Sequence, residues 1–198
     1  MAEKMTNRKR QAIETKNRLY ELSIALIREK GYDNIKLEEL CRKAGVSVGA
    51  FYHHFKNKAG IIVEAYRRVD EHFNSEIMDK LAGAGPFDRI IEYLSYQVKE
   101  TELFGVDVII QIYKAQLSDA TEFFLSPERG LPSNLHRLIV EAQRSGELSS
   151  EVSADLITED LLLINRGILY NWSLNRGNYD IAQKSRRVLS RYLETYRN

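Results

Sequence analysis

The stretch AGVSVGAFYHHFKNK, residues 44–58, gathers the side chains of this sequence that are best suited to contact a nucleic acid. Ser47 is a good N-cap for a short helix from Val48 to about Phe55. Phe51 and Phe55 are four residues apart and are expected to face a core. The other positions offer hydroxyl, imidazole and ammonium donors for phosphate oxygens, and small apolar groups for thymine methyls. We expect a DNA-facing surface made of Ser47, Val48, Gly49, Ala50, Tyr52, His53, His54 and Lys58.

The same side chains also have an ordinary structural interpretation. His53 and His54 could be surface residues of a helix, and Tyr52 could be a half-buried core ring. Only the combination of these side chains with the turn that precedes them favours a DNA-binding function. A metal site is not expected, because adjacent helix positions diverge by about 100° and no third ligand is evident.

Two preceding helices are predicted to hold this stretch in place. The segment NRLYELSIALIREKGY ends with Gly31, a helix C-terminal signal, and then Tyr32. The segment KLEELCRKA, residues 36–44, places Leu37, Leu40 and Cys41 on one face. Two short helices that are joined through a glycine and packed on a longer helix form a helix-turn-helix, whose second helix enters a DNA major groove.

Helical periodicity continues through the rest of the chain, so we predict an all-α fold of about nine helices. A long fourth helix is expected over 57–81, followed by a break at GAGP, residues 83–86. Further helices are expected at about 87–103, 106–117, 131–144, 153–176 and 179–196. The predicted domains are an N-terminal arm with the helix-turn-helix at 1–56 and a larger helical domain at 57–198, in which 57–81 is the connecting helix.

The formal net charge of +1 divides unevenly along the chain. Residues 1–60 hold 13 Lys and Arg against 7 Asp and Glu, and residues 61–198 hold 16 against 21. A basic N-terminal third favours a surface that faces a polyanion, and a solvated helix face is the alternative. Arg8, Lys9 and Arg10 are interpreted either as an arm that lies in a minor groove or as a disordered tail.

The composition argues against several other classes of protein. Cys41 is the single cysteine, so no intrachain disulfide can form, and no zinc ligand set is evident. No apolar run resembles a signal peptide, and no stretch approaches the roughly 18 apolar residues of a membrane span. We therefore expect a cytoplasmic protein with no membrane partner and no cofactor.

The segment EKGYDNIKLEELCRKAGVSVGAFYHHFKNK, residues 29–58, resembles the DNA-binding domain of the TetR family of bacterial one-component transcriptional regulators. The helix-ending glycine and aromatic, the alanine-glycine turn and the aromatic-x-His-Phe ending occur together at matching spacing. The resemblance implies a homodimer that binds a palindromic operator in double-stranded DNA, usually as a repressor. It also implies release by an unknown small-molecule effector, with residues 57–198 binding the effector and forming the dimer.

The chain departs from the family pattern at three places. Lys36 stands where serine or threonine is common, so it is expected to contact phosphate as a cation but cannot cap a helix. Val48 replaces a common lysine or arginine, and AGII at 59–62 replaces the usual acidic residue and leucine. Because the third helix lacks Arg, Asn and Gln, we expect modest direct base readout that is supplemented by DNA shape.

The last two predicted helices are expected to pair with those of a second copy as a four-helix interface, and an intramolecular core is the alternative. The interface residues predicted are Leu161, Ile164, Ile168, Ile181, Val188 and Tyr192. Polar and aromatic side chains within apolar stretches are the candidates for the effector pocket, although most aromatics at helical spacing belong to a core. They are Tyr66, Tyr93, Tyr96, Gln97, Gln111, Tyr113, Gln116, Asn165 and Trp172. This mixture predicts an uncharged or weakly polar, partly aromatic effector.

Two other functions compete with a DNA-binding regulator. An enzyme that uses Cys41 or a histidine is disfavoured, because Cys41 lies on an apolar helix face without an acid–base constellation around it. An all-helical protein-interaction module that does not bind DNA is the stronger alternative, since direct-readout residues are few. A salt-dependent DNA affinity would separate this module from a regulator, because phosphate neutralisation releases counterions.

Overall fold

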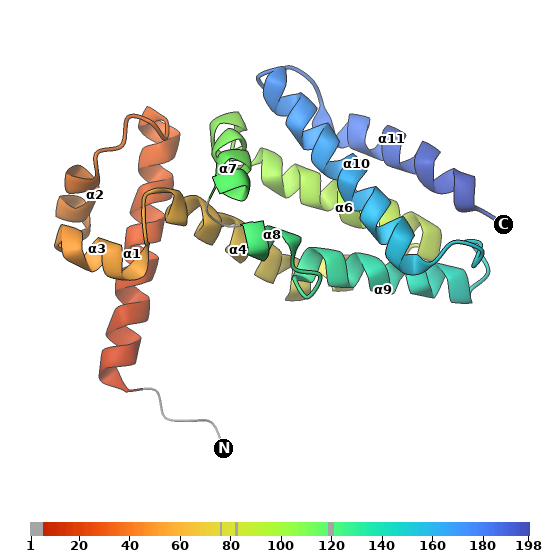
Figure 1. Cartoon of the computed structure of the whole chain (residues 1–198), viewed down its shortest axis with the longest axis horizontal. Helices are drawn as coiled ribbons and strands as arrows, with labels where there is room; N and C mark the ends of the chain where they lie inside the picture. The colour runs from red at the N-terminus through yellow and green to blue at the C-terminus, as the bar shows by residue number, and fades with distance from the viewer. Residues whose placement is uncertain (1–5, 76, 82, 119–120) are drawn as a thin grey trace. The chain divides into compact units, whose positions relative to one another are not determined.

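The computed structural model describes residues 6–75, 77–81, 83–118 and 121–198 (Figure 1). These residues form helices and loops, with one isolated β-bridge between Leu148 and Arg197. The all-α class predicted from the sequence is confirmed.

The N-terminal unit begins with α1, Asn7–Lys30, followed by the short helices α2, Leu37–Ala44, and α3, Val48–His54. α1 ends where predicted, because Gly31 adopts a φ of 78° and its N–H donates to the carbonyl of Ile27. Gly45 takes the left-handed conformation between α2 and α3, with a φ of 64°. These two glycines therefore end the two helices that precede α3.

The chain divides into two compact units, one that extends to Tyr66 and a second that begins at Arg67. The boundary falls inside α4, Ala59–Ser75. Lys16 Nζ in α1 lies 2.7 Å from Glu64 Oε2 in α4, so the first half of α4 is tied to the N-terminal unit. The division predicted from the sequence, after residue 56, stays a prediction.

The second unit, called the body here, contains the rest of the helices. They are α5, Ile77–Lys80; α6, Pro86–Glu102; α7, Val106–Ser118; α8, Thr121–Leu125; α9, Gly130–Arg144; α10, Ala154–Leu174; α11, Ile181–Leu193; and a final 3-10 turn, η1, Glu194–Tyr196. α6 packs against α9, α10 and α11 (Figure 1). Because three helices cover it, α6 supplies much of the apolar core, including Ile90, Leu94 and Val98.

Two helices of the body are capped by carboxylates from distant parts of the chain. The N-cap residues of α6 and α9 provide no side-chain cap. Glu147 Oε2 instead accepts the N–H of Phe87 at 2.9 Å, at the start of α6. Asp70 Oδ2 accepts the N–H of Gly130 at 2.9 Å, at the start of α9. In each case a negative charge satisfies free N–H groups at the positive end of a helix dipole.

The described residues contain the nine predicted helices and one further short helix, α8, that the sequence pattern does not reveal. The helix predicted over 57–81 corresponds to α4 and α5, with residue 76 outside the described residues. α8 is only five residues long, which is too short for helical periodicity to be read from sequence.

Candidate nucleic-acid interface and the helical body

The helix α3 is built as the sequence predicts. Ser47 Oγ accepts the N–H of Ala50 at 3.1 Å, which caps the helix, and Phe55 follows its last residue. Phe51 and Phe55 are both buried, and their ring centroids lie 5.3 Å apart. The two phenylalanines thus anchor one face of α3 in the core and leave the opposite face to solvent.

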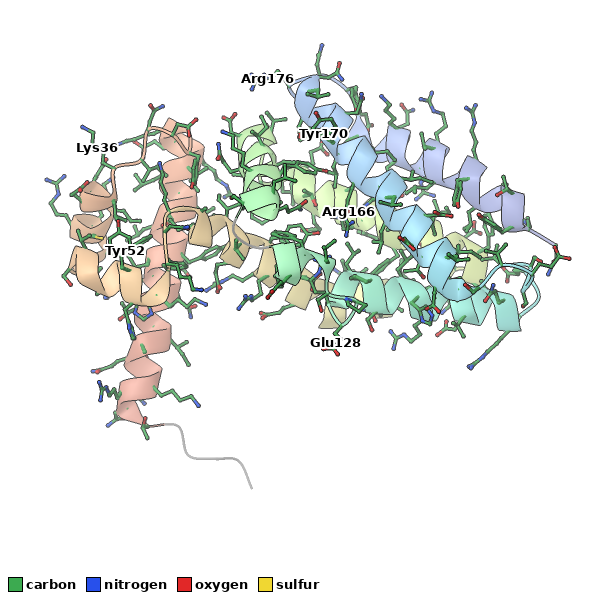
Figure 2. All side chains as sticks on the ribbon, viewed as in Figure 1. Lys36, Tyr52, Glu128, Arg166, Tyr170 and Arg176 are labelled. Carbon is green, nitrogen blue, oxygen red and sulfur yellow. The ribbon has the colours of Figure 1, made fainter. Side chains whose placement is uncertain are left out.

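That opposite face carries most of the residues predicted to contact DNA. Ser47, Gly49, Tyr52 and His53 are exposed, and the side chain of Tyr52 is among the most open aromatics, at 52%. The partly buried members of the predicted set are Val48, Ala50, His54 and Lys58. Lys36 precedes α2, is exposed and makes no side-chain cap, as predicted (Figure 2).

His54 and Lys58 are less available to solvent than Tyr52 and Lys36. Burial lowers the pKa of the His54 imidazole, and the nearby charges of His53 and Lys16 lower it further. Burial also lowers the pKa of the Lys58 amine, opposed in part by the charge of Asp33. Lys58 Nζ lies 4.4 Å from the ring centroid of Tyr32, a cation–π distance. A phosphate contact by Lys58 would therefore compete with a partner inside the unit.

The structure corrects the expectation that Arg8, Lys9 and Arg10 form an extended arm or a disordered tail. They lie in the first turn of α1, because Thr6 Oγ1 accepts the N–H of Lys9 at 3.3 Å and caps the helix there. They form neither an extended arm nor a disordered tail. All three are exposed, so they present positive charge from a helix.

The described residues offer little support for a reactive cysteine, a metal site or a membrane-spanning helix. Cys41 is buried, and burial raises the pKa of its thiol, which disfavours the reactive thiolate. No group of three or more His, Cys, Asp and Glu that could hold a metal occurs in the described ranges. In the same ranges, no helix is long and apolar enough to cross a membrane.

Comparison with known proteins identifies the helix-turn-helix. Residues 19–65, which include α2 and α3, match the model of bacterial regulatory proteins of the tetR family. This match identifies residues 19–65 as a TetR-family DNA-binding domain. The whole chain is similar to the repressor BepR of Brucella suis, which is 26% identical over 204 residues, covering 98% of this chain and 97% of BepR. The regulator CymR of Pseudomonas putida is 26% identical over 176 residues, covering 85% of this chain and 74% of CymR.

The likeness to a TetR-family repressor extends over both units. The structure of Thermus thermophilus FadR, in complex with lauroyl-CoA, superposes with a TM-score of 0.74. It covers 90% of this chain and 93% of FadR at 17% identity, which is a likeness of fold. The chain is a DNA-binding transcriptional regulator with a TetR-family helix-turn-helix.

In the body, two of the predicted pocket residues contact each other. Asn165 Nδ2 in α10 donates to Gln97 Oε1 in α6 at 2.6 Å, and both residues are buried. Gln97 Nε2 donates to Thr101 Oγ1 at 3.0 Å. Within the described residues, Asn165 Oδ1 is buried and accepts no hydrogen bond. The side-chain amides of Asn165 and Gln97 thus form a buried polar pair in the otherwise apolar interface between α10 and α6.

Three predicted pocket aromatics have structural roles. Tyr93 is fully buried and donates its hydroxyl to the carbonyl of Gly130 at 3.2 Å. Tyr113 donates to the carbonyl of Arg166 at 2.7 Å. Trp172 Nε1 donates to the carbonyl of Tyr179 at 3.0 Å. Each ring therefore joins two segments of the body.

The four remaining predicted pocket residues belong to three helices, α4, α6 and α7. Tyr66 is the last residue of the N-terminal unit. Tyr96 borders a shallow hollow between α6 and α11. Gln111 is buried in α7, and Gln116 is partly buried near its end. The structure does not gather the nine residues into one described cavity, and their role in effector binding stays a prediction.

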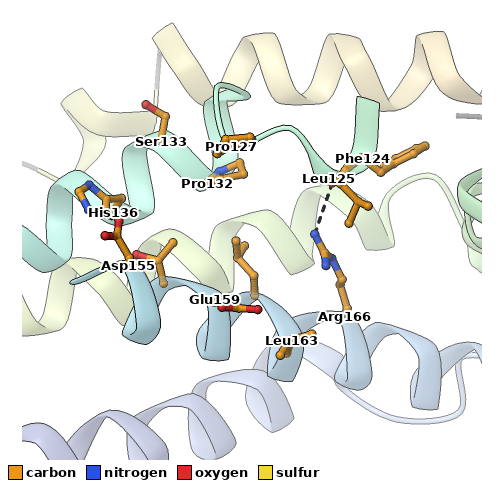
Figure 3. Close-up of a pocket in the computed structure, with 12 residues that line it drawn as sticks. Phe124, Leu125, Pro127, Pro132, Ser133, His136, Asp155, Glu159, Leu163 and Arg166 are labelled. Atoms are coloured by element: carbon orange, nitrogen blue, oxygen red, sulfur yellow. Dashed lines mark hydrogen bonds and ion pairs between the residues drawn. The ribbon is translucent and has the colours of Figure 1, made fainter. Parts of the chain in front are cut away.

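A groove of about 630 Å³ lies between the α8–α9 segment and α10 (Figure 3). None of the predicted pocket residues lines it. The lining residues are Phe124, Leu125, Pro127, Pro132, Ser133, His136, Asp155, Thr158, Glu159, Leu162, Leu163 and Arg166. Sequence reasoning missed this groove because its walls come from loop residues and from the outer side of α10, where no pattern marks a concave surface.

The predicted dimer residues lie mainly inside a single chain. Leu161, Ile168 and Ile181 are buried, and Ile164, Val188 and Tyr192 are partly buried. Tyr192 donates to Asp160 Oδ2 at 2.5 Å, and its pKa is raised by burial and by this bond. A different face of α10 is exposed and apolar. It consists of Leu156, Leu163, Tyr170 and Leu174, which are 53–62% exposed.

Proposed function

We propose that this chain is a homodimeric repressor that binds a palindromic operator and leaves it when a small-molecule effector binds in the body. It acts in the cytoplasm and catalyses no reaction. The observation that carries the proposal is the solvent-facing side of α3, where a capped, phenylalanine-anchored helix presents Ser47, Tyr52 and His53. This arrangement suits insertion into a major groove.

The DNA contacts divide into two kinds. Lys36, Tyr52, His53, His54 and Lys58 supply donors and charge for phosphates, which position the protein. The helix start, Ser47 to Ala50, has small side chains and approaches base edges closely. An added Cβ at Gly49 would meet only Ser47 Oγ within 4 Å, at 3.8 Å, so the protein itself leaves the space around Gly49 open.

The exposed apolar side of α10, which we call the α10 face, is proposed to pair with a second copy. Leu156, Leu163 and Tyr170 recur every seven residues, and Leu174 follows four residues later. Gly167 lies on the same exposed side, and a Cβ there would meet nothing within 4 Å. A seven-residue apolar repeat with a small residue at its centre suits close helix–helix packing. Two copies joined this way would present two recognition helices.

The effector is proposed to act by a population shift. Operator binding requires one spacing of the two recognition helices, and a ligand that prefers another packing of the body draws the dimer away from it. FadR of Thermus thermophilus, which shares this fold, was solved in complex with lauroyl-CoA, which supports a ligand-binding role for the body.

The first experiment selects bound sequences from a random double-stranded DNA pool and then titrates the winner against salt. A palindromic winner whose affinity falls steeply with salt is expected. Lys36→Gln should reduce the slope of log affinity against log salt by about one, whereas Arg191→Gln, an exposed change on α11, should leave it unchanged. A folded dimer that enriches no sequence would contradict the proposal and favour a protein-interaction module.

A further inference from the structure

The body carries a second hollow, which lies between α6 and α11. Its volume of about 470 Å³ falls within the range of sites that hold small molecules. The small side chains of Ser95 and Ala182 leave this space, and Tyr96 lines it with an aromatic ring. All of its lining residues belong to α6 and α11, so the hollow shares no residue with the α10 face.

Three charged side chains line this hollow. Lys99 of α6 and Arg186 of α11 are exposed, and Glu92 of α6 is partly buried. Across the described ranges of the chain, none of these three side chains makes a hydrogen bond or an ion pair. Two positive charges and one negative charge in the same hollow are therefore available to a ligand.

The helix α11 adds positive charge around the hollow, and its sequence contains no Asp or Glu. Its four basic residues are Lys184, Arg186, Arg187 and Arg191. Residues 61–198 as a whole hold 16 Lys and Arg against 21 Asp and Glu. The carboxylate just before the helix, that of Asp180, already accepts the N–H of Gln183 at 2.9 Å as the N-cap. A local excess of positive charge on an otherwise acidic body favours an anionic ligand at this helix.

The positive and negative charges of α6 lie at different levels of the hollow. The guanidinium of Arg197, which follows α11, lies 4.6 Å from the ring centroid of Phe87 at the start of α6, so the two helices run antiparallel. Lys99 is therefore on the side of the hollow nearer the start of α11. Glu92 lies seven residues before it, about 10 Å along the helix. This separation suits a ligand whose opposite charges are at its two ends.

We propose that this hollow binds a small phosphate monoester that also carries an amine. Arg186 offers a planar pair of N–H donors to the phosphate, and Lys99 supplies a second positive charge. A phosphate monoester carries nearly two negative charges at neutral pH, which matches the two cations, and the ammonium group matches Glu92. The inference goes beyond the proposed function, because binding at this site does not depend on an operator.

Binding is tested by calorimetric titration of the full chain with O-phosphoethanolamine. Ethyl phosphate, which lacks the amine, and ethanolamine, which lacks the phosphate, are the matched probes. O-phosphoethanolamine is expected to bind about fivefold more tightly than ethyl phosphate, and ethanolamine should show no saturable binding at about 10 mM. Equal affinity for the two phosphate probes would overturn the role of the amine. No saturable binding of O-phosphoethanolamine at the same concentration would overturn the site.

Variants of the charged residues test which side chain holds which end of the ligand. Arg186→Gln should weaken the binding of both phosphate probes about tenfold. Glu92→Gln should weaken O-phosphoethanolamine about fivefold and strengthen ethyl phosphate about twofold, because it removes an attraction for the amine and a repulsion of the phosphate. The matched control is Lys114→Gln, an exposed cation of α7 outside the hollow, which should leave all affinities unchanged. Equal losses in Lys114→Gln and Arg186→Gln would indicate a nonspecific effect of charge and would overturn the site.

A phospholipid headgroup contains the same two chemical groups, so the source of the ligand is tested separately. Phosphatidylethanolamine carries a phosphate diester with a single negative charge, and the two cations of the hollow therefore favour a soluble monoester. The protein is expected not to sediment with vesicles of phosphatidylethanolamine and phosphatidylcholine. Sedimentation with these vesicles, without binding of free O-phosphoethanolamine, would overturn the proposal.

These measurements separate the inference from the proposed function, because none of them uses DNA. Failure to find an operator would count against the proposed function alone, and the calorimetric result would still decide the phosphate site.

Discussion

The N-terminal unit carries most of the side chains predicted to contact DNA on one short helix, whereas the body buries most of the side chains predicted to bind an effector. In α3, the buried residues Phe51 and Phe55 hold the helix and the exposed residues Tyr52 and His53 face solvent. In the body, Tyr93 and Trp172 are themselves core residues with hydrogen-bonded polar ends. Core side chains and the side chains predicted to bind a partner are thus separated in the first region and intermixed in the second.

This difference predicts that single substitutions will act differently in the two regions. A change on the exposed face of α3 should alter binding with little effect on folding. A change at a predicted pocket residue of the body should first destabilise the fold, because a buried ring leaves a cavity when it is truncated.

The largest expected effect is in the body. Trp172→Ala should lower the free energy of unfolding by about 3–5 kcal/mol, because it leaves a cavity and removes the partner of the Tyr179 carbonyl. Urea unfolding followed by circular dichroism measures this change. A loss below about 1 kcal/mol would mean that the Trp172 site is adaptable, as expected of a pocket wall and not of a core.

The next effect concerns the α10 face. Leu163→Glu places a charge where we propose that two copies meet, so it should weaken the dimer by roughly 2 kcal/mol, about 30-fold in dissociation constant. Analytical ultracentrifugation over a concentration series measures this shift. Leu117→Glu, at an exposed leucine of α7, is the matched control and should leave the dimer unchanged. If the two variants have the same dimer dissociation constant, the α10 face is not part of the dimer interface.

A smaller effect is expected on the recognition helix. Tyr52→Ala should weaken operator binding about five- to tenfold, the equivalent of one lost hydrogen bond. Its free energy of unfolding should change by less than about 0.5 kcal/mol, since Tyr52 is half exposed. Gel-shift titration and urea unfolding of the same preparation test both parts. A large loss of stability would show that the Tyr52 ring is a core residue after all.

The smallest effect is a pH dependence of stability. Burial lowers the pKa of His54 below its ordinary value of 6.5, so the unfolded chain takes up this proton before the folded chain does. The stabilising contribution is present above pH 6.5 and declines as the pH falls below it. His54→Gln should flatten this part of the curve of unfolding free energy against pH. An unchanged curve in His54→Gln would show that His54 does not contribute to the pH dependence of stability.

The sequence by itself determined the local features of this protein. Gly31, Ser47, and the spacing of Phe51 and Phe55 act within a few residues of themselves, so the ends of α1 and α3 and the buried side of α3 follow from sequence. The all-α class and the nine longer helices follow for the same reason, because hydrophobic periodicity is a property of neighbouring residues.

Only the tertiary structure decided which side of each body helix is covered. α10 is apolar nearly all round, so its sequence does not show that Leu161 and Ile168 face the core while Leu163 and Tyr170 face solvent. The caps of α6 and α9 come from Glu147 and Asp70, which lie about 60 residues away along the chain. Such contacts depend on how the helices pack, and no local pattern encodes them.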